Sequence, residues 1–216
     1  MTTIPPDPPA SLRIAAPLIA RAREVTHVDR PVAYWCLFYA AQVALGTDAN
    51  ARDAAAQAYL VSLLDALEQM KDSLRAEPAV TDSATAAAHV ESFALSVFYA
   101  ADTDDRDGRA SRDTARAFAA ASKVLETLAV FGPVSPETTT KIRYAKWKAA
   151  DISKALREGR LEQRNQAAAT AAAAAADEST PPPPEPQAPA PADQDMHAQS
   201  YVLPSVPSDA AQEQGE

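Results

Sequence analysis

Residues 139–152 read Thr-Thr-Lys-Ile-Arg-Tyr-Ala-Lys-Trp-Lys-Ala-Ala-Asp-Ile, and the apolar residues of this basic stretch recur at intervals of three and four. With the turn that follows, they are Ile142, Ala145, Ala149, Ile152 and Leu156. This spacing predicts a helix with one apolar face. At about 100° per residue, Trp147 falls roughly opposite that face. The stretch therefore indicates a helix that buries one side and shows a large aromatic ring on the other.

Outward from this stretch, the second half of the chain predicts three helices. We expect them over residues 83–101, 111–131 and 135–159. Ser135 followed by Pro136 is typical of a helix start, and Gly132 followed by Pro133 is typical of a helix stop. The acidic residues 102–109 are expected to form a polar loop that caps the next helix.

The first half repeats the same plan, with predicted helices over residues 10–25, 31–46 and 50–74. Pro17 should kink the first of these or weaken its first turns. The helical pattern stops near Glu77-Pro78. The sequence therefore predicts an all-α protein of two consecutive three-helix bundles, over residues 10–77 and 78–165.

Both ends of the chain have a different composition. Residues 1–9 hold four prolines, which predicts a disordered arm. Residues 177–216 hold nine prolines and no Lys or Arg. We expect residues 166–216 to form a disordered linker and acidic tail. The alanine run over 167–176 could prolong the preceding helix, but it can bury little surface.

Charge and composition exclude several functional classes. The formal net charge is −9, yet all 20 Lys and Arg lie at or before Arg164, and eight of the 29 acidic residues lie beyond it. The helical region is thus nearly neutral, so bulk charge does not support nucleic-acid binding. A single cysteine, Cys36, favours a reducing compartment. Neither a signal peptide nor a membrane span is recognisable, and we expect a cytoplasmic protein.

The residues that carry enzymatic chemistry are poorly placed. His27, His89 and His197 are far apart, without carboxylate or cysteine at metal-ligand spacing. Five glycines in the whole chain leave no glycine-rich phosphate loop. The acidic run 102–107 lacks the glutamate that would close a calcium loop. We therefore expect a non-enzyme with no catalytic residue, cofactor or metal.

The basic helix carries one candidate binding surface. Arg143, Asp151 and Lys154 share the side of Trp147, and residues 141–164 hold eight basic and three acidic residues. This pattern fits an anchor for an acidic, apolar peptide, because tryptophan is enriched among residues that dominate binding energy. Packing of Trp147 on a neighbouring helix explains it about as well. Nucleic-acid binding by the same surface has no other support in the chain.

The helix over 50–74 carries a second candidate surface, off its core stripe. Its members are Gln57, Val61, Leu64, Glu68 and Lys71, at intervals of 4, 3, 4 and 3. An apolar strip edged by charges is what an amphipathic helix needs as a docking site, with Glu68 to pair an arginine. An ordinary solvated face with incidental apolar residues is the alternative.

Four separated motifs resemble one known family, in the right order. They are DRPVAYWC at residues 29–36, LDALE at 64–68, FALSVF at 93–98 followed by ADTDDRDGR at 101–109, and VFG at 130–132 followed by KIRYAKWKAADI at 141–152. The sequence resembles the vacuolar protein sorting regulators of the Vta (or Lip) family over residues 11 to about 160. The resemblance implies tandem MIT-like three-helix bundles.

The resemblance also implies partners. Members bind helical tails of ESCRT-III subunits, the charged multivesicular body proteins, and activate the AAA ATPase that disassembles ESCRT-III. By resemblance, the first bundle would bind one tail at Leu64 and Glu68, and helical spacing adds Val61 and Lys71 on the same face. The second bundle would bind another subunit at Trp147 and Lys148, and helical spacing adds Asp151 on the side of Trp147. This implies an adaptor in multivesicular body sorting that meets the endosome membrane only through its partners, as a peripheral protein.

One departure from the family pattern affects the ATPase. The family ends in a C-terminal helical hairpin that dimerises and binds the ATPase after a long proline-rich linker. This sequence stops at Glu216 within such a linker, without the hairpin. We expect either a fragment or shortened gene product, or a protein that binds ESCRT-III without direct ATPase activation. The alternative from another class is a rigid helical scaffold subunit that binds no free peptide.

Overall fold

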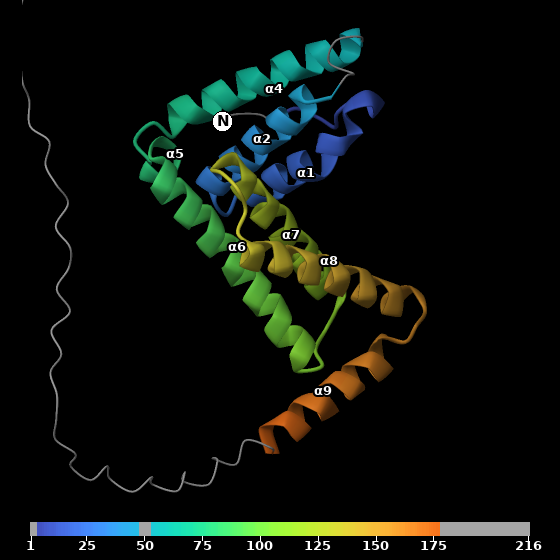
Figure 1. Ribbon diagram of the computed structural model, residues 1–216. Coiled ribbons are helices and arrows are strands. Elements are labelled where there is room, and N and C mark those ends of the chain that lie inside the picture. Colours follow the sequence, from blue (N-terminus) through green and yellow to red (C-terminus); the bar gives the residue numbers. More distant parts are fainter. Residues whose placement is uncertain (1–3, 48–52, 178–216) are drawn as a thin grey trace, which may run out of the picture. The chain divides into compact units, whose positions relative to one another are not determined.

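The computed structural model describes residues 4–47 and 53–177, and within these ranges it is helical and has no strand (Figure 1). The first half contains a 3₁₀ segment η1 (Ala10–Ala15), then α1 (Ala16–Val25), α2 (Arg30–Leu45) and α4 (Ala54–Ser73). The second half contains α5 (Pro78–Thr81), α6 (Ser83–Arg106), α7 (Arg112–Thr127), η2 (Leu128–Val130), α8 (Pro136–Arg157) and α9 (Leu161–Asp177). The predicted all-α class is confirmed. The predicted tail over 178–216 lies outside the described residues.

The helix starts follow from local sequence. Asp29, Asp53 and Asp82 accept backbone N–H groups at the starts of α2, α4 and α6, and such caps satisfy donors that have no partner inside the helix. Ser111 forms a capping box with Thr114 at the start of α7. Pro17 lies in the first turn of α1, and the residues before it form only the 3₁₀ segment. The predicted weakening at Pro17 thus appears as a split of the helix expected over 10–25.

Residues 4–9 correct the prediction of a disordered arm for the part that is described. Ile4 packs against the apolar core, and Pro5 is buried. The Tyr59 hydroxyl donates to the Pro6 carbonyl oxygen at 2.7 Å, and Arg23 forms an ion pair with Asp7 at 2.7 Å. These contacts hold the segment against α1 and α4 although it contains no helix.

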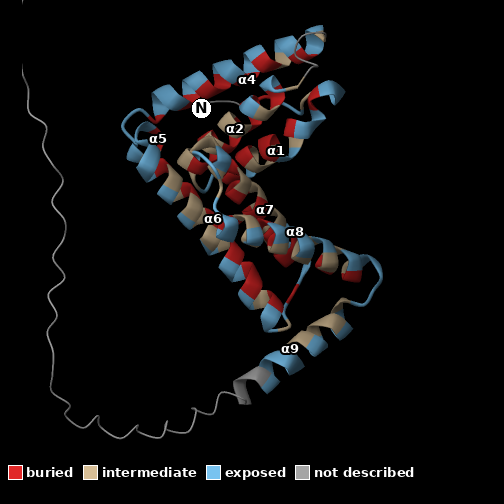
Figure 2. Ribbon diagram, in the orientation of Figure 1, coloured by how far each residue is buried: buried red, intermediate tan, exposed pale blue. Residues whose placement is uncertain are grey.

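The core of the first half is centred on α2, which buries eight residues, Val32, Ala33, Tyr34, Cys36, Leu37, Ala40, Ala41 and Ala44. Figure 2 shows buried residues on the side of α4 that faces α2 and exposed residues on its outer side. The Trp35 indole N–H donates to the Ala79 carbonyl at 2.8 Å. The ring centroids of Trp35 and Phe131 lie 4.6 Å apart. Residues from the second half therefore complete the surroundings of α2.

This core continues into the second half. Val90 and Ala94 of α6, Val124 and Leu125 of α7, and Ile142 of α8 belong to the same apolar cluster as α1, α2 and α4. A second cluster lies farther along α6, α7 and α8, around Phe98, Phe118 and Ile152. The division into bundles over 10–77 and 78–165 stays a prediction, and the described halves share apolar surface across that boundary.

Two predicted segments near the second cluster are corrected. Residues 102–106 are not a loop, because α6 continues to Arg106 and buries Asp102 and Asp105 on its inner side. Residues 166–177 are not linker, because they belong to α9. Gly159, with a φ of +65°, ends α8 in the left-handed conformation that glycine adopts without strain. The alanine run therefore forms a separate helix instead of prolonging α8.

Candidate partner-binding surfaces

The first surface is the outer face of α4, formed by Val61, Leu64, Glu68 and Lys71 and called here the α4 face. Val61 is 60% exposed and Leu64 is 41% exposed, which is high for large apolar residues. Glu68 and Lys71 are exposed beside them. The four predicted residues thus share one accessible face, and their role as partner contacts stays a prediction.

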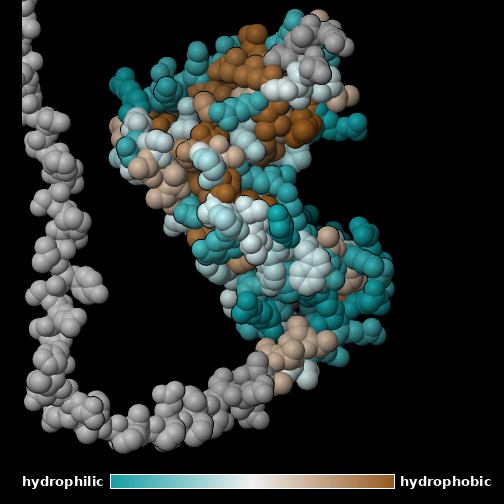
Figure 3. Space-filling view, in the orientation of Figure 1, coloured by the Kyte–Doolittle hydropathy of each residue, from teal (hydrophilic) through white to brown (hydrophobic). Residues whose placement is uncertain are grey.

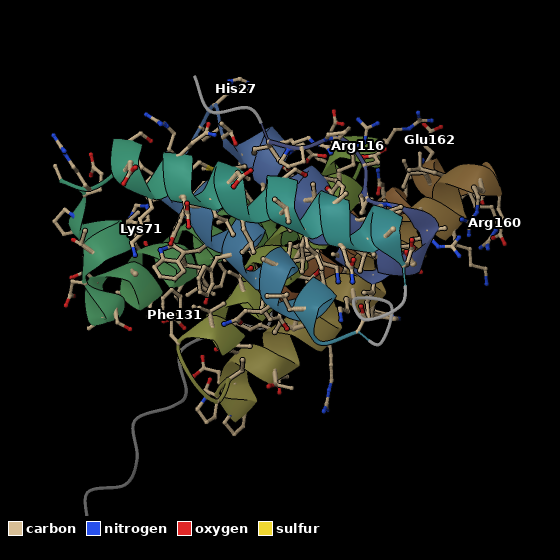
Figure 4. The ribbon with its side chains drawn as sticks, turned by 90° about the horizontal axis from the view of Figure 1, so that it is seen from above. His27, Lys71, Arg116, Phe131, Arg160 and Glu162 are labelled. Atoms are coloured by element: carbon tan, nitrogen blue, oxygen red, sulfur yellow. The ribbon has the colours of Figure 1, made fainter. Side chains whose placement is uncertain are left out.

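The α4 face is accessible because α4 is buried on its other side only. Leu60, Leu63, Leu67 and Met70 point into the core formed with α2. Figure 3 shows hydrophobic surface gathered over α4 and α2, whereas the surface over α8 is more hydrophilic. Figure 4 shows Lys71 on α4 and Arg160 of the α8–α9 turn at opposite ends of the view. Lys71 of the α4 face and the turn that follows α8 therefore lie well apart.

The second surface surrounds Trp147 on α8. The Trp147 side chain is 58% exposed, so it is not packed away beneath a neighbouring helix. Its ring centroid lies 6.0 Å from that of Tyr144. The Lys148 ammonium lies 5.1 Å from the centroid of the Trp147 ring and 5.3 Å from that of Tyr144. Cation–π attraction at this range holds the two aromatic rings around one charge.

Lys148 and Asp151 are placed differently from Trp147. The Lys148 side chain is only 15% exposed, and its Nζ lies 2.6 Å from Oδ2 of Asp105. Asp151 Oδ2 lies 2.7 Å from Nε of Arg164 on α9. Arg164 Nη1 in turn lies 2.6 Å from Oδ1 of Asp105. These four residues form the Asp105 cluster, which ties α6, α8 and α9 together.

Asp105 and Arg164 are residues of this cluster, beneath Trp147, that sequence reasoning missed. A signal was present for Asp105, since Phe98, Ala101 and Asp105 continue the spacing of three and four past the predicted end of the helix. Arg164 gave no such signal, because it lies 59 residues from Asp105 along the chain. Only the folded structure brings the two together.

The electrostatics of the cluster favour its charged form. Burial raises the pKa of the Asp105 carboxyl, but hydrogen bonds from Arg164 and Lys148 lower this pKa by more, so it lies below its usual value. Burial lowers the pKa of Lys148, and the carboxylate of Asp105 raises it above its usual value. The ions stabilise one another, so Asp105, Lys148 and Arg164 stay ionised at neutral pH.

The rim of the Trp147 surface keeps positive charge. Among the described residues, Arg143 and Lys154 have no ion-pair partner, whereas Lys146 pairs with Glu126 on α7. The carboxylate of Asp151 is neutralised by Arg164. The surroundings of the exposed ring are therefore suited to an acidic ligand.

Residues 4–47 and 53–177 contain neither a candidate metal site nor a candidate membrane-spanning helix. No cluster of three or more His, Cys, Asp or Glu side chains there could bind a metal ion. Nor does any helix in these ranges combine the length and apolar character needed to cross a bilayer.

Comparison with known proteins gives one consistent result. The family model described as "Vta1 like" matches residues 15–158. The chain is 44% identical over 155 residues to the Arabidopsis thaliana protein named homolog of mammalian LYST-interacting protein 5, which covers 72% of this chain and 35% of that protein. It is 34% identical over 163 residues to the Bos taurus vacuolar protein sorting-associated protein VTA1 homolog, covering 76% of this chain and 52% of that protein.

The Homo sapiens protein of the same name is 32% identical over 158 residues, which is 73% of this chain and 51% of the human protein. The chain thus spans between one third and about half the length of these relatives. The matched region contains α1 to α8, with the α4 face and Trp147. Because the family model covers more than half of its residues, the chain belongs to the Vta1-like family.

Proposed function

We propose that this chain is an adaptor in vacuolar and multivesicular body sorting that docks helical tails of ESCRT-III subunits. The observation that carries the proposal is the α4 face, where Val61 and Leu64 stand exposed beside Glu68 and Lys71. An amphipathic helix could bury both apolar side chains and place an arginine against Glu68. The names of the relatives, vacuolar protein sorting-associated proteins, support the same pathway.

The size of the α4 face limits the affinity of this interaction. Full burial of an aliphatic side chain contributes about 1.5–3 kcal/mol. Two such anchors contribute about 3–6 kcal/mol together, which offsets only the lower end of the cost of association, estimated at about 4–15 kcal/mol. The partner must therefore be a helix several turns long that also pairs with the charged residues. We expect reversible, moderate binding of the kind that suits a transient assembly.

We further propose that the second half is a second MIT-like unit that binds another ESCRT-III subunit through the Trp147 surface. An acidic, apolar helix suits this surface, because Arg143 and Lys154 flank the exposed ring. Two sites on one chain would increase avidity for an ESCRT-III polymer on the endosome membrane. In longer members of the family, a C-terminal domain would connect this recognition to the AAA ATPase. The chain itself would perform no chemistry.

Binding of labelled ESCRT-III tail helices, followed by fluorescence anisotropy, tests the proposal. We expect saturable binding by some of the helices. Leu64→Asp should abolish binding of the helices that use the α4 face, because it places a carboxylate among the apolar anchors. Gln69→Asp adds the same charge at another exposed position of α4 and should leave binding intact. Trp147→Asp should affect a different set of helices.

The alternative function, a rigid scaffold subunit, makes a different prediction for the same experiment. A scaffold would show no saturable binding of any free tail helix. Binding that survives both Leu64→Asp and Trp147→Asp would overturn the assignment of the two surfaces. Strong, steeply salt-dependent binding to RNA or DNA would point to a nucleic-acid function instead.

A further inference from the structure

We infer that α9 is part of the Trp147 surface and that Arg164 is its positioning residue. This inference rests on the proposed function of Trp147 as a partner contact. The family match ends at residue 158, before α9 begins at Leu161. A role for α9 is therefore not contained in the family assignment.

A continuous series of short contacts connects Arg164 to the exposed ring. Arg164 Nη1 contacts Oδ1 of Asp105 at 2.6 Å, and Lys148 Nζ contacts Oδ2 of the same carboxylate at 2.6 Å. The Lys148 ammonium then lies 5.1 Å from the centroid of Trp147. Asp105 thus receives one cation on each oxygen, and the second of these cations faces the aromatic ring.

Because the Asp105 side chain is buried, its carboxylate depends on both cations. The Asp105 side chain is only 2% exposed, so water cannot replace a cation that leaves it. Removing one partner from a buried ionic cluster is costly, because it leaves charge without compensation. Without Arg164, the Asp105 carboxylate would be left with Lys148 as its remaining cation and would draw the ammonium further inward. The ammonium would then lose its fixed position beside the Trp147 ring.

Arg164 is itself held in place by the packing of α9. The Asn165 side-chain amide donates to the Ala110 carbonyl at 2.9 Å. Gly108, with a φ of +69°, lies so close that an added Cβ would be 2.4 Å from the Asn165 carbonyl oxygen. Leu161 packs against the second apolar cluster. The turn after α6 and the start of α9 therefore fit closely around Arg164.

Arg164 also sets the charge of the surface. Its Nε lies 2.7 Å from the Asp151 carboxylate, which shares the side of Trp147 on α8. With Asp151 neutralised, Arg143 and Lys154 determine the sign of the charge around the ring. Loss of Arg164 would free an anion at this rim. Arg164 thus favours an acidic partner in two ways, through the position of the ring and through the charge beside it.

The indole N–H signals of the ¹⁵N-labelled chain test the inference without any partner. Trp147→Phe assigns the signal of Trp147, and the remaining signal belongs to Trp35. In Arg164→Met we expect the Trp147 signal to shift and its heteronuclear NOE to fall, because the ring loses its fixed neighbour. The Trp35 signal should not change. Arg160→Met is the matched control, since Arg160 pairs only with the exposed Glu158.

A second variant covers the case in which Arg164→Met fails to fold. Gly108→Ala pushes against α9 without changing any charge, and it should also release Trp147. Gly159→Ala is its control, because it has a similar φ of +65° and no atom within 4 Å of an added Cβ. If the Trp147 signal is as ordered in Arg164→Met and Gly108→Ala as in the two controls, the inference is wrong.

Binding gives the second readout. Arg164→Met should weaken Trp147-dependent binding of an acidic ESCRT-III tail helix by roughly 2- to 10-fold. This is the expected cost of fixing one side chain, here Trp147, on binding when it is not already ordered in the free protein. Helices that bind the α4 face should be unaffected. If no helix depends on Trp147, the proposed function of this surface fails, while the indole signals still decide whether Arg164 positions the ring. Unchanged Trp147-dependent affinity in Arg164→Met would contradict the role in binding.

Discussion

Asp105 shows how a single residue can join three helices. Its carboxylate is buried near the end of α6 and contacts Lys148 of α8 and Arg164 of α9. Such a group stabilises the fold only while it is ionised and fully paired. The free energy of unfolding should therefore depend on pH.

At acid pH, the free energy of unfolding should reflect the ionisation of Asp105. Its pKa in the folded chain lies below the unfolded value of about 3.9. The stabilisation is therefore complete above about pH 4 and is lost as pH falls through the lower folded pKa. Urea unfolding between pH 2 and 6 checks this. We expect the difference in free energy of unfolding between the natural chain and Asp105→Asn to shrink below about pH 4, and a constant difference would contradict it.

Cys36 should be unreactive in the folded chain. Burial raises the pKa of its thiol to about 11, although the Thr127 hydroxyl close to the sulfur lowers it slightly. Since the thiolate is the reactive form, the folded chain should resist a thiol reagent such as DTNB at pH 8. In urea the same thiol should react within minutes. Rapid reaction without denaturant would show that α2 is more accessible than the structure indicates.

The turn between α6 and α7 is the element that decides where α9 can lie. Gly108 adopts a positive φ and touches Asn165 of α9, whereas Gly159 adopts a similar φ in open space. Alanine at either site costs about 1–2 kcal/mol for the left-handed conformation. The close contact should add about 1–3 kcal/mol at Gly108 only. We expect Gly108→Ala to lower the free energy of unfolding by clearly more than Gly159→Ala in urea titrations, and equal losses would show that α9 does not pack there.

The elements also show which parts of the structure were predictable. The predicted ranges 31–46, 111–131 and 135–159 located α2, α7 and α8, because apolar spacing and a helix start such as Ser135-Pro136 are local signals. The end of α6 was misplaced because acidic residues resemble a loop until their cationic partners are known. The alanines of α9 have no apolar periodicity, and its anchors Arg164 and Asn165 bind residues more than 50 positions away. Long-range polar contacts of this kind leave no pattern in one sequence.

For the two candidate surfaces, helical spacing predicted the direction of the side chains but not their burial. Val61 and Leu64 of the α4 face and Trp147 of α8 stand exposed on the predicted faces. Lys148 came from the family resemblance, and the structure places it mostly inside the Asp105 cluster. Helical spacing gives the direction of a side chain. It does not show whether another helix will cover that side chain.

At the scale of the whole molecule, the two halves share apolar surface. Val90 and Ala94 of α6 join the cluster around α2, and Trp35 of α2 packs on Phe131. Such continuity favours one cooperative transition over two independent ones.

Urea unfolding followed by each tryptophan separately tests this cooperativity. Trp147→Phe leaves Trp35 as the reporter of the first half, and Trp35→Phe leaves Trp147 as the reporter of the second half. Within each variant, we expect the fluorescence midpoint to coincide with the midpoint from far-UV circular dichroism. Two separate transitions would instead indicate bundles that fold independently.

The most direct measurement of the function is a chemical-shift titration of the ¹⁵N-labelled chain with an ESCRT-III tail helix that binds it. We expect the perturbed amides to cluster along α4 around Val61, Leu64, Glu68 and Lys71, and Leu64→Asp to abolish the perturbation at the same peptide concentration. A saturable titration that perturbs neither α4 nor the Trp147 surface, or one that perturbs α4 and is unchanged in Leu64→Asp, would contradict docking at these two faces.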